Sequence, residues 1–575
     1  MLPLRMRRVL FIPLVVFGYY LWYNQQALKE FQRNVQKARN WANEKGNLVE
    51  PWLLVLITTV IVVVVIKLHS FLYGPSQYGR WTRIKRAFFR ITRKIPFIGG
   101  SIQKKLRKAM ADVEKSGYMI KPDEPCNTTL PKKGWDHQRI LKELNKYDDV
   151  LGGANWESGF VSGAVYNGSP EITDLSTDVY KRYAWTNPLH GDLFPQIKKM
   201  EAEVVAMGVK IFNGGKDACG TMTSGGTESI LMAMKAYREI AIERGIEMPE
   251  ILAPSTAHCA FDKAADYFRM KLVRVPVSGK SFSCAGRTMH RYVTSNTIVL
   301  IGSVPQFPHG AIDPIEEFAK VAQYHAIFLH VDCCLGGFIA PFAEKAGFNI
   351  PPFDFRVKGV SSISADTHKY GFAPKGSSLI MYSSRQLRIK QFFAATEWPG
   401  GVYASPTMAG SRSGAIIATT WATMMNFGEE GYIESTRKII STTQKIENGL
   451  RNIPGLYVMG KPQLSVVAVS SKDFSVYRLA SEMKKKGWHL NYLQKPAGIH
   501  LAVTMRHTQE GVAEKFVTDA RQSVEAIKKE PEGPLEGEGA FYGISQNIPD
   551  KSIVSDMALS FIELFYKAEK ESLFF

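Results

Sequence analysis

A lysine in a polar cluster interrupts an apolar, β-rich part of the sequence. The apolar run 360–365 ends at the polar residues 366–369, and a second apolar run, 379–382, follows Gly376. A lysine held where a buried strand ends can lose hydration, lower its pKa and attack a carbonyl as a free amine. An ordinary loop lysine has the same local sequence. Lys369 therefore needs supporting residues elsewhere in the chain.

A carboxylate upstream supplies the first support. Residues 326–332 form a predicted buried strand that ends in Asp332, and Lys369 follows 37 positions later. An acid at a strand end can keep the pyridine nitrogen of pyridoxal phosphate protonated, while a lysine carries the cofactor as a Schiff base. Gly336 and Gly337 come soon after the acid, and such a pair lets backbone approach a ligand.

Small residues before a predicted helix supply the second support. Gly225, Gly226 and Thr227 precede an apolar helical pattern at 230–238. Backbone N–H groups at such a helix start can hold a phosphate. A Gly-Gly pair alone is more often a simple helix cap. In the order cradle, aspartate and lysine, the three features predict a pyridoxal 5'-phosphate site.

These motifs resemble the fold-type I pyridoxal phosphate enzymes of the decarboxylase group, and the resemblance to sphingosine-1-phosphate lyases is more specific. It covers about residues 51–546 and includes the string at 539–543. It implies an α/β fold of the PLP-dependent transferase type, with a mostly parallel sheet in a large domain, a smaller C-terminal α/β domain and an N-terminal transmembrane anchor. The strings that carry it are Asn187-Pro-Leu-His190, Pro305-Gln-Phe-Pro-His-Gly310, Ser364-Ala-Asp-Thr-His-Lys-Tyr-Gly371 and Ser405-Pro-Thr-Met-Ala-Gly-Ser-Arg412.

The resemblance implies roles for individual residues. Lys369 and Asp332 are the expected catalytic pair, and His258 is expected to stack on the pyridine ring and to move protons. Without the resemblance, His258 reads as a helix-capping or core histidine. No metal is expected. The predicted cofactor-binding set is Lys369, Asp332, His258, Gly225, Gly226, Thr227 and His368.

A further set matches lyase positions near the cofactor and the substrate phosphate. Lys375 has a physical argument, because a cation beside a loop glycine can bind a dianion. Arg412 fits that role or a structural ion pair equally well. Cys333 stands where the family usually has alanine, and residues 279–290 match the family poorly. The predicted substrate-binding residues are Tyr166, Asn187, His190, Lys375 and Arg412.

The implied activity is that of a PLP-dependent aldehyde-lyase of sphingolipid degradation. It would cleave phosphorylated long-chain bases, such as sphingosine 1-phosphate, to a fatty aldehyde and phosphoethanolamine, and it would act as a homodimer. The alternative is an amino-acid decarboxylase of the glutamate decarboxylase type, which needs a cation for an α-carboxylate and no membrane segment. A non-catalytic membrane scaffold would tolerate loss of Lys369 or Asp332, and both are present.

The elements that must position these residues alternate along the chain. Helical patterns near 230–244 and 261–268 alternate with strand patterns near 251, 272–275 and 298–303. This alternation predicts a largely parallel sheet covered on both faces, with ligands at the carboxyl ends of its strands. A long helical pattern from 411 to 449, a strand at 464–470 and a helix at 477–487 predict the smaller domain. The predicted divisions are 1–73 (membrane region), 74–144 (basic lead-in), 145–412 (large domain), 413–546 (small domain) and 547–575 (tail).

Charge and hydropathy predict a membrane partner. The net charge of +19 suggests nucleic acid, but eleven Lys or Arg residues and no acid lie between 74 and 111, directly after an apolar segment. This placement favours anionic lipid over nucleic acid, and a solvated linker stays open. The apolar run 52–66 would reach only about 22 Å as a helix, whereas 52–73 would reach about 33 Å and cross the hydrocarbon core of about 30 Å.

The arginines before the first apolar block and the pattern of cysteines bear on how the chain is placed relative to the membrane. The block at 9–23, preceded by Arg5, Arg7 and Arg8, could be a signal peptide, an anchor or an interfacial segment. Six scattered cysteines without metal or disulfide spacing suit a reducing compartment. The expected location is the endoplasmic reticulum membrane, with the catalytic domain in the cytosol.

Overall fold

The computed structural model describes residues 51–73, 80–92, 126–530 and 551–566, together with scattered residues at 29–40, 100 and 533–543. The chain divides into two compact units, Met1–Ala87 and Phe88–Phe575. The predicted apolar block at 9–23 lies outside the described residues.

The first unit contains a helix in the predicted apolar segment, α3 (Pro51–Tyr73). Its described side chains are mainly β-branched and aliphatic, and Leu56, Val60 and Val64 are about half exposed. Among the described residues, no helix combines the length and the apolar character needed to cross a membrane. The transmembrane anchor expected at 52–73 is therefore not shown.

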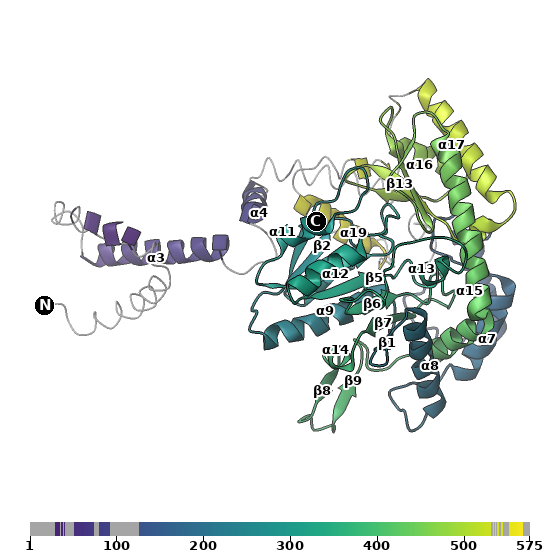
Figure 1. Cartoon of the computed structure of the whole chain (residues 1–575), viewed down its shortest axis with the longest axis horizontal. Coiled ribbons are helices and arrows are strands. Elements are labelled where there is room, and N and C mark those ends of the chain that lie inside the picture. Colours follow the sequence, from purple (N-terminus) through teal and green to yellow (C-terminus); the bar gives the residue numbers. More distant parts are fainter. Residues whose placement is uncertain are drawn as a thin grey trace. The chain divides into compact units, whose positions relative to one another are not determined.

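The second unit is built around a seven-stranded sheet with the order β1-β7-β6-β5-β4-β2-β3 (Figure 1). Strands β2 to β6 run parallel to one another, and β7 is antiparallel to both of its neighbours, β1 and β6. The predicted, mostly parallel sheet is confirmed. Its strands are β1 (Cys219–Thr223), β2 (Glu250–Pro254), β3 (Lys271–Val275), β4 (Thr297–Ser303), β5 (Phe328–Asp332), β6 (Ser362–Ala365) and β7 (Ser378–Tyr382).

Both faces of the central strands are buried, which explains their uninterrupted apolar sequences. Alternate residues of β4 enter different hydrophobic clusters, with Leu300 on one face and Val299 and Ile301 on the other. Helices α9 and α10 cover the second face, and α12 packs against β4 and β5. The helices between residues 137 and 389 are α6 (His137–Leu151), α7 (Pro170–Tyr183), α8 (Pro195–Ile211), α9 (Gly226–Glu243), α10 (Ala260–Tyr267), α11 (Gly286–Tyr292), α12 (Ile315–Tyr324), α13 (Ala340–Ala343) and α14 (Arg385–Ile389).

A long helix, α15 (Gly414–Arg451), leads from the large sheet to a second, smaller layer. It is kinked at Gly428, whose φ of 56° is unusual for a residue with a side chain. The following sheet is antiparallel, with the order β10-β11-β13-β12, and α16 and α17 pack beside it. The remaining elements are α4 (Arg80–Thr92), the hairpin β8 (Phe393–Ala395) and β9 (Tyr403–Ser405), β10 (Tyr457–Val458), β11 (Val466–Ser470), α16 (Val476–Lys485), β12 (Asn491–Leu493), β13 (Gly498–Ala502), η1 (Met505–Thr508), α17 (Val512–Lys529) and α19 (Lys551–Leu564).

The predicted helices and strand of this C-terminal part are confirmed as α15, α16 and β11. The predicted boundary at 412 and 413 falls immediately before α15. Residues 88–575 nevertheless form one compact unit, and the finer division into domains stays a prediction.

Trp488 should contribute strongly to the stability of the smaller layer. Its side chain is fully buried, its Nε1 donates to Asp519 Oδ2 at 2.8 Å, and its ring stacks on Phe160 at 4.3 Å between centroids. We expect Trp488→Ala to lower the free energy of unfolding by about 3–5 kcal/mol, because it opens a cavity and removes a hydrogen bond. Thermal and urea denaturation would measure the loss. Trp398→Ala, at a site 58% exposed, is the control and should change little.

Candidate active site

The polar residues singled out in the sequence gather at the carboxyl edge of the parallel strands. Asp332 ends β5, where it lies beside Ser303 of β4 and Ser364 of β6. Two residues after Ser364, the chain leaves the sheet at Asp366 and enters the turn that carries His368 and Lys369. The sheet thus places an acid and a lysine from separate motifs at neighbouring strand ends.

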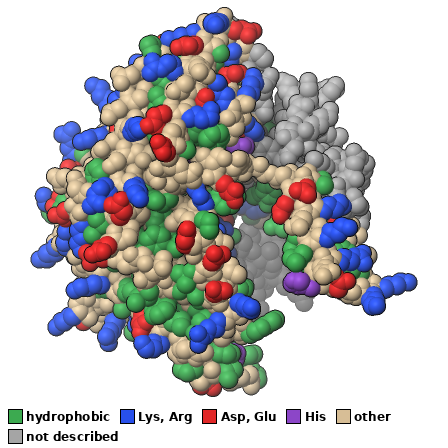
Figure 2. All heavy atoms as spheres, turned by 90° about the vertical axis from the view of Figure 1, so that its right-hand side faces the viewer, with side chains coloured by type: hydrophobic (Ala, Val, Ile, Leu, Met, Phe, Trp, Pro, Cys, Tyr) green, Lys and Arg blue, Asp and Glu red, His purple; other side chains and the backbone are tan. Residues whose placement is uncertain are grey.

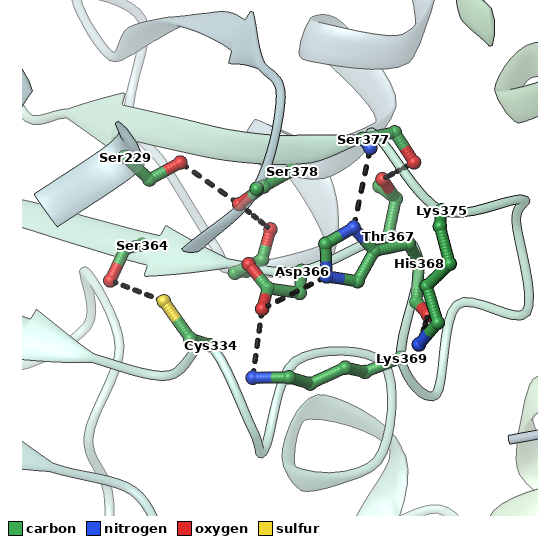
Figure 3. Close-up of polar contacts among 12 residues, drawn as sticks. Ser229, Cys334, Ser364, Asp366, Thr367, His368, Lys369, Lys375, Ser377 and Ser378 are labelled. Atoms are coloured by element: carbon green, nitrogen blue, oxygen red, sulfur yellow. Dashed lines mark hydrogen bonds and ion pairs between the residues drawn. The ribbon is translucent and has the colours of Figure 1, made fainter. Parts of the chain in front are cut away.

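Lys369 forms an ion pair with the buried Asp366, and the lysine side chain itself is 25% exposed (Figure 3). Lys369 Nζ lies 2.9 Å from Asp366 Oδ2, and His368 Nε2 lies 3.5 Å from the same oxygen. Asp366 is only 1% exposed, and its second oxygen, Oδ1, has no hydrogen-bond partner among the described residues. One carboxylate oxygen therefore contacts both neighbouring side chains, and the other oxygen is left as a free acceptor.

The lowered pKa that burial can give a lysine is not found for Lys369. Burial is the largest single influence and pushes the pKa of Lys369 down, but the attraction of Asp366, together with smaller contributions from Tyr166 and Cys334, outweighs it, and the net shift is upward. The pKa of Asp366 moves the opposite way. Burial raises it, and the combined effect of Lys369 and His368 brings it below its usual range. The lysine is thus held as an ammonium, and it must give up a proton before it can act as a nucleophile.

Asp332 is buried and only partly engaged. Its Oδ1 accepts a hydrogen bond from the backbone N–H of Cys334 at 3.1 Å. The Cys334 thiol donates to Ser364 Oγ at 3.2 Å, and burial raises the pKa of the thiol well above its usual value. The acid at the strand end is therefore oriented by the turn that follows it.

The phosphate cradle predicted at residues 225–227 lies at the N-terminus of α9. The first hydrogen bond of the helix runs from Ser229 N to Gly225 O at 3.0 Å, which leaves the preceding N–H groups outside the helical pattern. A Cβ on Gly226 would lie 2.7 Å from Asp366 Oδ1 and 2.8 Å from Cys334 Sγ. Only glycine lets the start of the helix approach Asp366 this closely.

Glu228 is a part of the cradle that the sequence analysis missed. Its Oε2 accepts from the backbone N and the Oγ of Ser224, both at 2.6 Å, and its Oε1 accepts from Met408 N at 3.0 Å. It joins the cradle to the string at 405–412.

Asp366 was missed as well, although it stands inside a quoted motif. Three positions before a lysine in a turn, an acid is a signal that could have been used.

Two other expectations change in the structure. Gly336 and Gly337 were expected to admit a ligand, but a Cβ on either would meet protein, at 2.0 Å from Val304 O and 2.8 Å from Ala365 Cβ respectively. Their role is to pack the turn after β5 against the sheet.

His258 follows β2, and its Nδ1 accepts from Ala260 N at 3.1 Å. It caps the start of α10, and its stacking on a cofactor stays a prediction.

Tyr166 and Lys375 are brought together beside His368. Lys375 Nζ lies 4.8 Å from the centroid of the Tyr166 ring and donates to the His368 carbonyl oxygen at 3.4 Å. Burial, followed by repulsion from Lys369, lowers the pKa of Lys375. Burial also raises the pKa of Tyr166, so its phenol stays neutral. Among the described residues, no carboxylate pairs with Lys375.

The other expected substrate-binding residues are engaged with one another. Arg412 forms a bidentate ion pair with Glu201, with one contact at 3.0 Å, which matches the structural alternative for this arginine. Asn187 Oδ1 accepts from Arg412 N at 3.2 Å. His190 is exposed and follows in the same turn. Within the described part of the chain, no hydrogen bond or ion pair links these residues to Lys369.

The donor set fits pyridoxal 5'-phosphate. Asp332 offers a carboxylate for a protonated ring nitrogen, Lys369 an amine for the aldehyde, and the start of α9 free N–H groups for the phosphate. The buried, unpartnered Asp366 Oδ1 is a further acceptor facing the same place. The described residues contain no group of three or more His, Cys, Asp or Glu side chains that could hold a metal.

Comparisons with known proteins point to one kind of enzyme. The pyridoxal-dependent decarboxylase conserved domain matches residues 154–472. Sphingosine-1-phosphate lyase 1 of Mus musculus is 47% identical over 534 residues, 93% of each chain, and the lyase of Saccharomyces cerevisiae is 42% identical over 90% of each chain. Among solved structures, the lyase of Burkholderia pseudomallei is 41% identical, with a TM-score of 0.67 over 69% of this chain and 92% of that one. Glutamate decarboxylase of Lactobacillus brevis, at 21% identity and a TM-score of 0.60, shares the fold.

Asp366→Asn should make Lys369 reactive at lower pH. The amide cannot balance the ammonium charge, so burial alone would act on the lysine and lower its pKa. Visible absorbance would follow the capture of pyridoxal phosphate by the apoprotein across a pH series. We expect the midpoint of capture to fall by at least about one pH unit, which is about 1.4 kcal/mol of lost interaction. Glu243→Gln neutralises a carboxylate at the far end of α9, where it pairs with Lys390, and should leave the midpoint in place. An unmoved midpoint in Asp366→Asn would contradict the coupling.

Proposed function

Because this chain belongs to the pyridoxal-dependent decarboxylase family and, within it, to the sphingosine-1-phosphate lyases, we propose that it cleaves phosphorylated long-chain bases. The products would be a fatty aldehyde and phosphoethanolamine, as in sphingolipid degradation. One observation carries the proposal: the amine of Lys369, the carboxylate of Asp332 and the open N–H groups of α9 meet at one edge of the sheet.

The enzyme is a PLP-dependent lyase, and pyridoxal 5'-phosphate is its cofactor. When bound, this group supplies an electron sink for the carbanion left after a carbon–carbon bond is cleaved. The chain's residues have to bind it, hold a proton on its ring and manage the protons of the substrate. Each of these tasks can be assigned to a group in the site.

Lys369 carries the amine that reacts with the cofactor, and Asp366 controls its charge. The ion pair favours the ammonium, so Asp366 or His368 has to accept or relay the proton that leaves. Asp332 would keep the ring nitrogen protonated, because a carboxylate stabilises a cation that it contacts. Gly225, Gly226 and Thr227 would hold the cofactor phosphate, and His258 would lie over the ring.

The substrate phosphate is assigned to Lys375. This ammonium has no carboxylate partner among the described residues and lies at the edge of the site, against Tyr166. Tyr166, Asn187, His190 and Arg412 would complete the substrate site. For Arg412, the ion pair with Glu201 favours a supporting role. The alternative, an amino-acid decarboxylase of the glutamate decarboxylase type, is supported at the level of the fold alone.

We further propose that the chain is anchored in the endoplasmic reticulum membrane, with its catalytic part in the cytosol. Helix α3 exposes a row of aliphatic side chains. Helix α4 is basic, and its apolar residues Trp81, Ile84, Phe88 and Ile91 are exposed at helical spacing. A basic amphipathic helix of this kind is suited to an anionic lipid surface. Anchoring would also bring the enzyme to a substrate whose alkyl chain prefers lipid.

A homodimer is the proposed assembly. Helix α6 is amphipathic and has no buried residue, and Ile140, Leu141 and Leu144 are each about half exposed. Such a face is unusual on an isolated chain and suits a protein partner. A second copy of this chain would supply one.

The function is tested by offering the purified enzyme two substrates. A phosphorylated long-chain base should yield aldehyde, whereas glutamate should yield no carbon dioxide. Asp332→Asn should bind cofactor but lower kcat by orders of magnitude, because an amide cannot keep the ring nitrogen protonated. Near-normal turnover in Asp332→Asn would remove this acid from the proposed role, and carbon dioxide from glutamate would favour the decarboxylase.

Lys375→Ala should weaken substrate binding and leave cofactor binding unchanged. A charge-assisted contact is worth roughly 1.5–3 kcal/mol, so we expect KM to rise about ten- to a hundredfold. Steady-state kinetics and the cofactor's visible absorbance would separate the two effects. Lys375→Arg keeps the charge and should recover much of the affinity. Loss of bound cofactor in Lys375→Ala would instead assign this lysine to the cradle.

The proposed orientation predicts how protease acts on sealed microsomes. The positive residues after Tyr73 resist translocation, so the catalytic part should face the added protease and be digested without detergent. A lumenal marker protein in the same vesicles is the control for their integrity. The sequence Asn127-Thr-Thr129 is a glycosylation acceptor that can be used only in the lumen. A catalytic part protected until detergent is added, or glycan on Asn127, would contradict the orientation.

A further inference from the structure

A large hollow opens next to the candidate active site. Its volume is about 720 Å³, and Tyr166, His368 and Lys375 line the end nearest Lys369. Helix α7 forms one wall, and residues 372–375 form another. Figure 2 shows the face of the molecule that carries α7 and α15, where hydrophobic side chains gather between the charged ones. A hollow of this size is large enough for a whole organic ligand.

The part of α7 that lines the hollow is one face of the helix. Ile172, Ser176 and Tyr180 recur every four residues, and Thr173 and Thr177 repeat the same spacing one position later. Residues four apart lie above one another on a helix, so these side chains form a continuous wall. Ile172 is buried, and Tyr180 is about half exposed.

The wall is less polar than its composition suggests. Thr173 Oγ1 donates to Ser169 O at 2.9 Å, and Thr177 Oγ1 donates to Thr173 O, also at 2.9 Å. Thr419, across the hollow, uses its hydroxyl in the same way toward Ala415 O at 2.9 Å. Because these hydroxyl protons are already engaged with backbone, the threonines need no polar ligand. The opposite wall adds Phe372, with Ala373 and Pro374.

One end of this apolar hollow carries a cation. Lys375 has no carboxylate partner among the described residues, and its amine lies over the Tyr166 ring. The hollow therefore suits a phosphorylated amphiphile, with a positive end beside the catalytic lysine and a mainly apolar body leading away from it; the exposed Lys181 of α7 also lines the hollow, next to Tyr180.

We propose that this hollow holds the alkyl chain of the substrate, and that the α7 face formed by Thr173, Thr177 and Tyr180 sets the chain length that the enzyme prefers. The inference rests on the proposed function, because it takes the phosphate to lie at Lys375. Each methylene that leaves water for the hollow should improve binding up to about fourfold, until the hollow is filled.

A series of unreactive alkyl phosphates, used below their micelle concentrations, tests this with the holoenzyme. We expect the affinity measured by calorimetry to rise steeply from butyl to decyl phosphate. Thr177→Trp should abolish most of that rise, leave butyl phosphate binding and the cofactor absorbance unchanged, and lower kcat/KM for long-chain substrates selectively. Asp178→Trp, one position along α7 and outside the hollow, is the matched control and should keep the rise.

Ser176→Phe is a second variant in the same wall, and it should also flatten the chain-length series. Affinity that does not depend on chain length in the wild type would overturn the inference, as would an unchanged rise in both wall variants. Sedimentation would show whether a second copy of the chain occupies the hollow instead. A change of oligomeric state in Thr177→Trp but not in Asp178→Trp would mean that it does, and would also overturn the inference. Failure of the proposed function is distinct, because the wild type would then cleave no phosphorylated base of any chain length.

Discussion

The ion pair between Lys369 and the buried Asp366 is the interaction on which the site depends. An ammonium at the end of a buried strand would lose much of its hydration, and the carboxylate three residues before it offsets that loss. The raised pKa of Lys369 stabilises the folded state fully below the ordinary lysine pKa of about 10.4, and this stabilisation is lost as the pH rises through the raised pKa. The lowered pKa of Asp366 stabilises the folded state above the ordinary aspartate pKa of about 3.9, and this stabilisation is lost as the pH falls through the lowered pKa. The pair is thus intact across the physiological range.

The same pair explains why neighbouring residues are so restricted. Gly226 must lack a side chain, because the start of α9 approaches the carboxylate oxygens of Asp366. His368 shares the carboxylate and receives a hydrogen bond from Ser377 N at 3.3 Å, which ties the turn to the start of β7. The phosphate cradle, the lysine and the antiparallel strand are therefore held to one another through a single acid.

The sequence was most informative where burial leaves an uninterrupted apolar run. Strands β4, β5 and β7 were predicted within a few residues because both faces of the sheet are covered. The insertion of β7 between β1 and β6 was not predictable, because strand order depends on contacts between distant segments. The charge of Lys369 was not predictable from the sequence for a related reason. Burial was foreseen, but the partner that reverses its effect lies in a turn whose geometry only the folded chain defines. The role of Gly336 likewise depends on Val304, which comes from a different strand.

The central claim is that Lys369, and no other lysine, carries the cofactor. Borohydride reduction of the holoenzyme fixes the cofactor to its lysine as a stable secondary amine, and peptide mass spectrometry then locates the added mass. The account predicts that a single peptide containing Lys369 is labelled, with Lys375, only six residues away, unmodified. Label on Lys375, or on a lysine outside the turn after β6, would contradict the account.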